Sequence, residues 1–284
     1  MSEGEGSTAE ASGGGDRNLP LAIASGVLLV ALLIGTVLWH PAAWAALVTV
    51  LALIGIVEAG RVCRDAGAPV ETAPVVVALF VMMFAAYHAQ HAGQAVGVTT
   101  LFVTAFVWEL ADPERRDVFR KIGTTLLLGL WVPFLASFAL LLAQIQPDGW
   151  VATLATVGAA VANDVGAYAV GVRFGRHKLA PSVSPGKTWE GVVAGLAIAA
   201  ILSVLTLPFL GRSQLFDPLS AFVFAVVVGG AGVLGDLSES VLKRDLGIKD
   251  IGGIIPGHGG VLDRMDAILL ALPTGYFTLA LLRG

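Results

Sequence analysis

The chain has 284 residues, of which 56% are hydrophobic and only 13% are charged, with a mean hydropathy of +0.82 and a formal net charge of −4. A soluble domain of this size would carry about 25% charged residues, so this composition excludes an ordinary soluble globular protein. The single cysteine, Cys63, excludes an internal disulfide framework. The sequence also contains neither a zinc-type Cys/His cluster nor a glycine-rich Walker loop.

The first segment, residues 1–18, is acidic and rich in glycine, and Met1 is its one large apolar side chain. Such a composition cannot bury enough surface to offset the entropy lost on ordering, so it predicts a disordered tail. Its acidic flank differs from the basic start of a secretory signal peptide. Residues 19–284 are interpreted as one transmembrane domain.

After the tail, apolar runs of membrane length alternate with short polar stretches, as in a helical membrane bundle. No stretch keeps the two-residue alternation of a membrane strand. The sequence therefore predicts an all-α, polytopic transmembrane bundle of about nine spans, at residues 19–39, 42–57, 74–87, 95–110, 122–145, 150–171, 191–210, 219–235 and 264–282. The third and fourth spans are shorter than the ~20 residues that a crossing needs, so they are predicted to be either tilted partners or a re-entrant pair.

Lysine and arginine fall mainly on one side of these spans, which sets the orientation through the positive-inside rule. With a cytoplasmic N-terminus, all but two of the 17 basic residues lie inside, and only Arg212 and Arg283 lie outside. This arrangement predicts a protein integral to the cell (inner) membrane, with its two long polar loops, 172–190 and 236–263, facing the cytoplasm. Four basic residues need no role beyond orientation: Arg115, Arg116, Arg120 and Lys121.

The first polar loop and the span before it contain candidate substrate-binding residues. Asp164 falls inside an apolar helix, where an ionisable group is costly and usually functional. Pairing with an arginine of a neighbouring helix is the structural alternative for Asp164. Ser184 and Lys187, in the sequence S-P-G-K-T, resemble an anion-binding turn that leads into a helix N-terminus.

The second polar loop contains two groups of acidic residues. Asp236, Ser240 and Lys243 stand at i, i+4 and i+7, so a helix would place them on one face. Asp263 and Asp266 likewise share a face at the start of the last span. The sequence G-G-I-I-P-G-H-G-G between the two groups suits a folded-back loop whose backbone can approach a ligand.

Basic side chains surround these carboxylates, and the combination indicates a class of chemistry. Mg²⁺ in proteins is held by one or two carboxylates together with phosphate oxygens and waters. Phosphoryl and nucleotidyl transfer depend mainly on positioning and charge neutralisation, which such residues can supply. The alternative is a set of solvated loop charges, but here acids and bases alternate with glycines in a way that orientation does not require. The further candidates are Arg244, Lys249, Asp250, His258 and Arg264.

These two polar segments resemble the sequence motifs of a known enzyme family. The stretch S-V-L-K-R-x4-K-D-I-G-G-I-I-P-G-H-G-G-V-L-D-R-M-D, Ser240 to Asp266, resembles the signature of the phosphatidate cytidylyltransferase family (CDP-diacylglycerol synthases). The segment A-Y-A-V-G…F-G-R-H-K-L-A-P…S-P-G-K-T-W-E-G is similar to the second common block of that family. Gly186 departs from it, because many members have a lysine there. The N-terminal half resembles the family only in hydropathy.

The resemblance implies a nucleotidyltransferase that transfers CMP from CTP to phosphatidate, giving CDP-diacylglycerol and pyrophosphate for phospholipid synthesis. It implies that residues 19–284 form the catalytic domain, that Asp236 and Asp263 bind a divalent metal, and that Lys243 acts beside them as a catalytic residue. Mg²⁺ is the expected cofactor, with a second cation left open. The expected substrate-binding residues are Asp164, Ser184, Lys187, Ser240, Arg244, Lys249, Asp250, His258, Arg264 and Asp266. The expected partners are CTP, phosphatidate and the lipid bilayer. No nucleic acid partner is expected, and the formation of a homodimer is left open.

Three other classes of membrane protein are the alternatives to this one. A CTP-dependent lipid kinase, acting on a polyprenol or phytol, would direct attack at the γ-phosphorus and release CDP. A CDP-alcohol phosphotransferase is disfavoured because its aspartate motif is absent. A secondary transporter would place its site near the bilayer midplane, often within internal repeats, whereas the polar residues here concentrate at one face.

Overall fold

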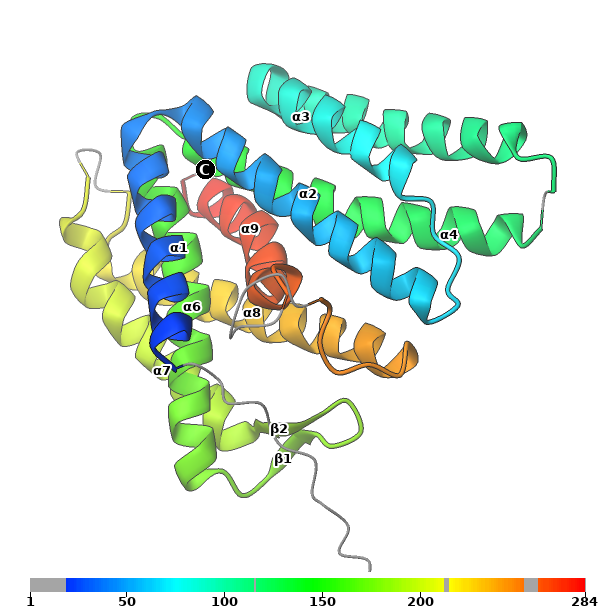
Figure 1. The fold of residues 1–284 in the computed structure, drawn as a ribbon. Helices are drawn as coiled ribbons and strands as arrows, with labels where there is room; N and C mark the ends of the chain where they lie inside the picture. The colour runs from blue at the N-terminus through cyan, green and yellow to red at the C-terminus, as the bar shows by residue number, and fades with distance from the viewer. Residues whose placement is uncertain (1–18, 115, 212–214, 253–259, 284) are drawn as a thin grey trace, which may run out of the picture.

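The computed structural model describes residues 19–114, 116–211, 215–252 and 260–283, and the predicted tail, 1–18, lies outside them. The described chain is a bundle of helices with one small sheet (Figure 1). Its elements, in chain order, are α1 (Leu19–Trp39), α2 (Pro41–Asp65), α3 (Thr72–Ala111), α4 (Val118–Gly129), η1 (Leu130–Phe134), α5 (Leu135–Ala143), α6 (Gly149–Phe174), β1 (Lys178–Ala180), β2 (Ser184–Thr188), α7 (Trp189–Thr206), η2 (Leu207–Phe209), α8 (Pro218–Asp245) and α9 (Leu262–Arg283).

Seven of the described helical segments are long and apolar enough to cross a membrane. They are α2, α3, the continuous run from α4 through α5, α6, α7 with η2, α8 and α9. The predicted all-α polytopic bundle is therefore confirmed. The apolar stretch described within α1, Gly26–Trp39, is shorter than these seven, and the predicted count of nine spans stays a prediction.

Helix α3 is two helical arms joined at a sharp break (Figure 1). Gln90 has φ 48° and ψ −123°, which interrupts the helical backbone. Two contacts show that the arms pack against each other. Thr104 Oγ1 donates a hydrogen bond to the Pro74 carbonyl, and a Cβ added at Gly97 would overlap Met82. The predicted spans 74–87 and 95–110 are these two arms, and small residues at their contact allow the close approach.

Two helices continue past the predicted ends of their spans. α2 extends to Asp65 rather than ending at 57, and α8 extends to Asp245 rather than ending at 235. Hydropathy falls at the first charged residues, but backbone hydrogen bonding in a helix does not depend on side-chain polarity. The predicted loop 236–263 therefore begins only after Asp245.

The first polar loop forms a small antiparallel hairpin, which the all-α prediction did not include. β1 pairs with β2 in the register Lys178 with Thr188 and Ala180 with Ser184. The S-P-G-K-T segment, predicted to be a turn, is the strand β2. It does lead into a helix as expected, since the hydroxyl of Thr188 accepts a hydrogen bond from Gly191 N at 3.2 Å and caps α7.

The second half of the chain packs tightly because glycines lie where its helices meet. Asn163 Nδ2 on α6 donates to the Gly229 carbonyl of α8 at 3.3 Å. A Cβ added at Gly235 would overlap the Asp266 carbonyl of α9. Close contact between α8 and α9 brings their acidic residues together, and this contact builds the candidate site.

Candidate active site

A cavity of about 270 Å³ opens between α6, β2, α7 and α8. One part of its wall is polar and carries four of the predicted residues: Asp164, Ser184, Lys187 and Asp236. The remainder is largely apolar and includes Ala167, Tyr168, Val172, Val192 and Val233. The cavity therefore joins a charged surface to an apolar one, as an amphiphilic ligand would require.

Lys187 and Asp236 form the central contact of this cavity. Lys187 Nζ lies 2.5 Å from Asp236 Oδ2, and both side chains are about one-fifth exposed. Ser240, one helical turn further along α8, donates its hydroxyl to Asp236 Oδ1 at 3.3 Å. The predicted helical face of Asp236, Ser240 and Lys243 is confirmed by α8, which spans all three.

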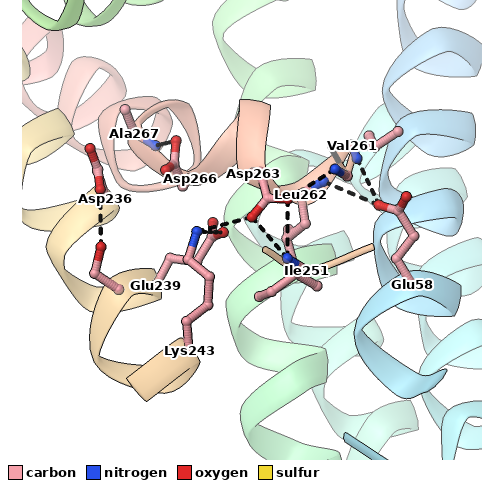
Figure 2. Close-up of polar contacts among 12 residues, drawn as sticks. Glu58, Asp236, Glu239, Lys243, Ile251, Val261, Leu262, Asp263, Asp266 and Ala267 are labelled. Atoms are coloured by element: carbon pink, nitrogen blue, oxygen red, sulfur yellow. Dashed lines mark hydrogen bonds and ion pairs between the residues drawn. The ribbon is translucent and has the colours of Figure 1, made fainter. Parts of the chain in front are cut away.

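Two of the predicted catalytic residues, Lys243 and Asp263, form an ion pair that joins α8 to α9 (Figure 2). Lys243 Nζ donates to Asp263 Oδ1 and to Glu239 Oε1, in each case at 2.9 Å. Glu239 is completely buried, and the structure gives its other carboxylate oxygen no hydrogen-bond partner. Sequence reasoning missed Glu239, although its i, i+4 spacing to Lys243 is a usable signal for an ion pair on a helix.

Asp263 also fixes the backbone on both sides of the glycine-rich segment. Its carboxylate accepts hydrogen bonds from Ile251 N, at 3.0 and 3.1 Å to the two oxygens, and from Gly260 N at 2.9 Å. Together with Lys243, these donors occupy both oxygens of the side chain. A carboxylate has about four lone-pair positions for such bonds, so Asp263 is close to saturated.

Asp164 and Asp266 complete an acidic group around Asp236. Asp266 interacts electrostatically with Asp236, Asp164 and Lys243, and Asp164 interacts with Lys187 and Arg264 as well as with Asp236. The Asp266 carboxylate accepts a hydrogen bond from Ala267 N at 2.6 Å. The structure thus brings together the two predicted acidic groups and the intramembrane Asp164, which came from three different helices.

The remaining predicted residues lie less centrally. Arg244 Nε donates to the Val183 carbonyl at 3.0 Å, which ties the end of α8 to the hairpin between β1 and β2. Lys249 and Asp250 are exposed in the turn after α8, and Arg264 is exposed on α9. His258 lies outside the described residues.

Glu58 is a second residue that sequence reasoning missed. It lies on α2 with only 2% of its surface exposed, and its Oε2 accepts hydrogen bonds from Val261 N at 2.7 Å and Leu262 N at 3.5 Å (Figure 2). The predicted span ended at residue 57, which placed Glu58 in a loop. The sequence offered little signal for it, because only Ala59 and Gly60 separate Glu58 from the charged residues Arg61, Arg64 and Asp65.

Of the basic residues assigned only to orientation, Lys121 and Arg116 form ion pairs outside this site, and Arg115 lies outside the described residues. Lys121 Nζ lies 2.7 Å from Asp112 Oδ2 and 3.7 Å from Glu109 Oε2, and its hydrogen bond lowers the pKa of Asp112. Arg116 pairs with Glu114 at 3.8 Å. These contacts connect the end of α3 with the start of α4 and include none of the predicted site residues.

Comparison with known proteins assigns the chain to a family. Residues 21–282 match the model of the cytidylyltransferase family. The chain is 34% identical over 282 residues to the phosphatidate cytidylyltransferase of Mycobacterium leprae, covering 94% of this chain and 89% of that protein. It is 36% identical over 195 residues to the phosphatidate cytidylyltransferase of Pseudomonas aeruginosa (68% and 72%) and 35% over 197 residues to that of Thermotoga maritima (66% and 70%). With a match over nearly its whole length and a site built on its signature residues, this chain belongs to the cytidylyltransferase family.

Proposed function

We propose that this protein is a phosphatidate cytidylyltransferase, which transfers CMP from CTP to phosphatidate and releases pyrophosphate. The observation that carries the proposal is the cavity that joins Lys187 and Asp236 to an apolar wall between membrane helices, in a chain whose relatives carry that name over most of its length. A charged cavity with an apolar side suits a phosphate attached to acyl chains.

The reaction brings together two anions, so their charges must be neutralised before they meet. A phosphate oxygen of phosphatidate attacks the α-phosphorus of CTP in line, forming a new P–O bond. The bond between the α-phosphorus and the bridging oxygen breaks, and pyrophosphate leaves with the electron pair. The attacking phosphate is already ionised near neutral pH, because its second pKa is about 6, so the site needs no strong general base.

The chain's own cations supply much of the neutralisation. Lys187 faces the cavity and would move from Asp236 to a phosphate oxygen as substrate binds. Lys243, between Glu239 and Asp263, holds the two helices that carry the carboxylates. Arg264 lies within electrostatic range of Asp164 at the same site. Because the attacking phosphate needs no strong base, we assign His258, which lies outside the described residues, to substrate positioning rather than proton abstraction.

The donor set fits a magnesium ion at Asp236. A bound Mg²⁺ would neutralise and orient the triphosphate oxygens. Mg²⁺ needs only one or two protein carboxylates beside phosphate oxygens and waters. Asp263 fits such an ion only if some of its present hydrogen bonds open. Asp266 interacts electrostatically with Asp236, and we propose it as an alternative second ligand.

We further propose that the protein lies in the inner membrane with its N-terminus and its site in the cytoplasm. The predicted nine spans follow if α1 crosses the membrane, if the run from α4 through α5 crosses it once, and if each of the two arms of α3 crosses it separately. The distribution of lysine and arginine supports this orientation, as does the supply of CTP from the cytosol. Whether the protein forms a homodimer stays an open question.

The test of this function is the identity of the products. Purified protein, CTP and phosphatidate should release pyrophosphate and form CDP-diacylglycerol in equal amounts, and diacylglycerol or a polyprenol in place of phosphatidate should give neither. Release of CDP with a phosphorylated lipid alcohol would instead establish the competing lipid kinase.

A further inference from the structure

Glu58 occupies an unusual position for a residue so far from the signature sequence. It lies on α2, in the N-terminal half of the chain, yet its carboxyl contacts the first turn of α9. The first N–H groups of a helix have no partner within that helix. An acidic side chain satisfies them and interacts favourably with the positive end of the helix dipole.

The carboxyl of Glu58 also touches the chain before the glycine-rich segment. Gly252 has φ +95°, and a Cβ added there would overlap the Glu58 carboxyl. The neighbouring residue, Ile251, donates its N–H to Asp263. Glu58 and Asp263 therefore each contact both the chain around Gly252 and the chain entering α9, and they do so from opposite sides (Figure 2).

Val261 and Leu262, which bond to Glu58, immediately precede Asp263. Asp266 lies one helical turn further along α9 and interacts with Asp236 of the cavity. Any shift in the start of α9 would displace both carboxylates relative to α8. The contact of Glu58 therefore sets where the acidic residues of α9 stand.

We propose that Glu58 is a positioning residue for the transfer reaction, which holds the first turn of α9 so that Asp263 and Asp266 stay in register with Asp236 and Lys243. The inference rests on the function proposed above. Glu58 acts through α9, and it is absent from the wall of the cavity that carries Lys187 and Asp236.

The test compares Glu58→Ala and Glu58→Gln with a matched control. Glu109→Ala is that control, because Glu109 is also a buried acid on a membrane helix, 5% exposed, but contacts Lys121 rather than the site. Two quantities are measured on purified protein: hydrogen exchange of the backbone amides from Val261 to Met265, and kcat and KM for CTP.

Glu58→Ala should accelerate exchange at those amides by about tenfold or more, since local opening controls exchange. It should lower kcat by more than about tenfold, equivalent to ~1.4 kcal/mol, while KM for CTP changes by less than about threefold. Glu58→Gln should recover most of both quantities, because its amide oxygen can still accept from Val261 N. Glu109→Ala should leave exchange at these amides and kcat near wild type.

Unchanged exchange in Glu58→Ala would overturn the contact itself. Faster exchange with normal kcat would overturn the positioning role and leave only a helix cap. If Glu58→Ala does not insert, Glu58→Asp replaces it, and equal kcat in the aspartate and wild-type proteins would count against the proposal. Failure of the proposed function is separate, because wild-type protein would then make no CDP-diacylglycerol whatever the exchange results.

Discussion

Lys187 Nζ lies 2.5 Å from Asp236 Oδ2, and this contact joins the strand before α7 to the middle of α8 across the cavity. Both side chains are about one-fifth exposed, so each can exchange its partner for one from solution. A lysine and an aspartate that face one cavity can take up a phosphate and a cation respectively. The first prediction follows from this pair.

Lys187→Ala should lower kcat/KM for phosphatidate by about tenfold or more, equivalent to ~1.4 kcal/mol, because the variant loses the cation facing the cavity. Lys187→Arg should retain more activity than Lys187→Ala. The control is Lys178→Ala, which removes an exposed lysine from the same hairpin. Equal losses in the two alanine variants would show that Lys187 contributes only to the general surface charge.

Asp236→Asn and Asp263→Asn should each abolish turnover while the protein stays folded and inserted. Asp236→Asn removes the charge that faces Lys187, and Asp263→Asn removes the charge that holds Lys243 and the start of α9. The measurement is the amount of CDP-diacylglycerol formed at equal protein concentration. The control is Glu114→Gln, because Glu114 is an exposed acid that pairs with Arg116. Either variant that keeps more than about a tenth of the wild-type rate, a loss of less than ~1.4 kcal/mol, would contradict its assignment.

Gly97→Leu should destabilise the protein, because a side chain at this position would overlap Met82 and force the two arms of α3 apart. Overpacking of this kind typically costs about 1–3 kcal/mol. Gly123→Leu is the matched control, since nothing lies within 4 Å of a Cβ added at Gly123. Thermal unfolding in detergent measures both, and a midpoint for Gly97→Leu equal to that of the control would rule out close packing of the arms.

The helical bundle could be predicted because a chain in the bilayer must satisfy its backbone polar groups internally, and apolar runs of spanning length show where helices do so. Their ends could not be predicted as well, because α2 and α8 keep their backbone hydrogen bonds beyond the first charged residues. Because the predicted span ended at residue 57, Glu58 was not predicted to lie on α2. The return of the chain at Gln90 was left open, because a sequence does not distinguish a tilted pair of short spans from a re-entrant one.

The proximity of Asp236, Asp263 and Asp266 could be expected because their helical spacing and their resemblance to a family signature agreed. Their partners were not found. The pairs of Lys187 with Asp236 and of Lys243 with Asp263 connect different elements, and no local pattern encodes such contacts. Asp263 was predicted to be a metal ligand, yet its carboxylate is largely occupied by two backbone N–H groups and a lysine.

Orientation is tested with single cysteines in a Cys63→Ser background, at Gly186→Cys, Ser213→Cys and Gly253→Cys. If the distribution of basic residues has been interpreted correctly, an impermeant thiol reagent outside intact cells should label only position 213. Opening the cells should expose positions 186 and 253. Gly186 tolerates the change because nothing lies within 4 Å of a Cβ added there. Labelling of position 253 from outside would reverse the topology.

The central claim is that CMP, and not the γ-phosphate of CTP, passes to the lipid at the cavity of Lys187 and Asp236. The most direct measurement supplies purified protein and phosphatidate with CTP labelled at either the α- or the γ-phosphorus and follows the label. The α-label should enter the lipid, the γ-label should leave in pyrophosphate, and Asp236→Asn should abolish both. Recovery of the γ-label in the lipid would contradict the account.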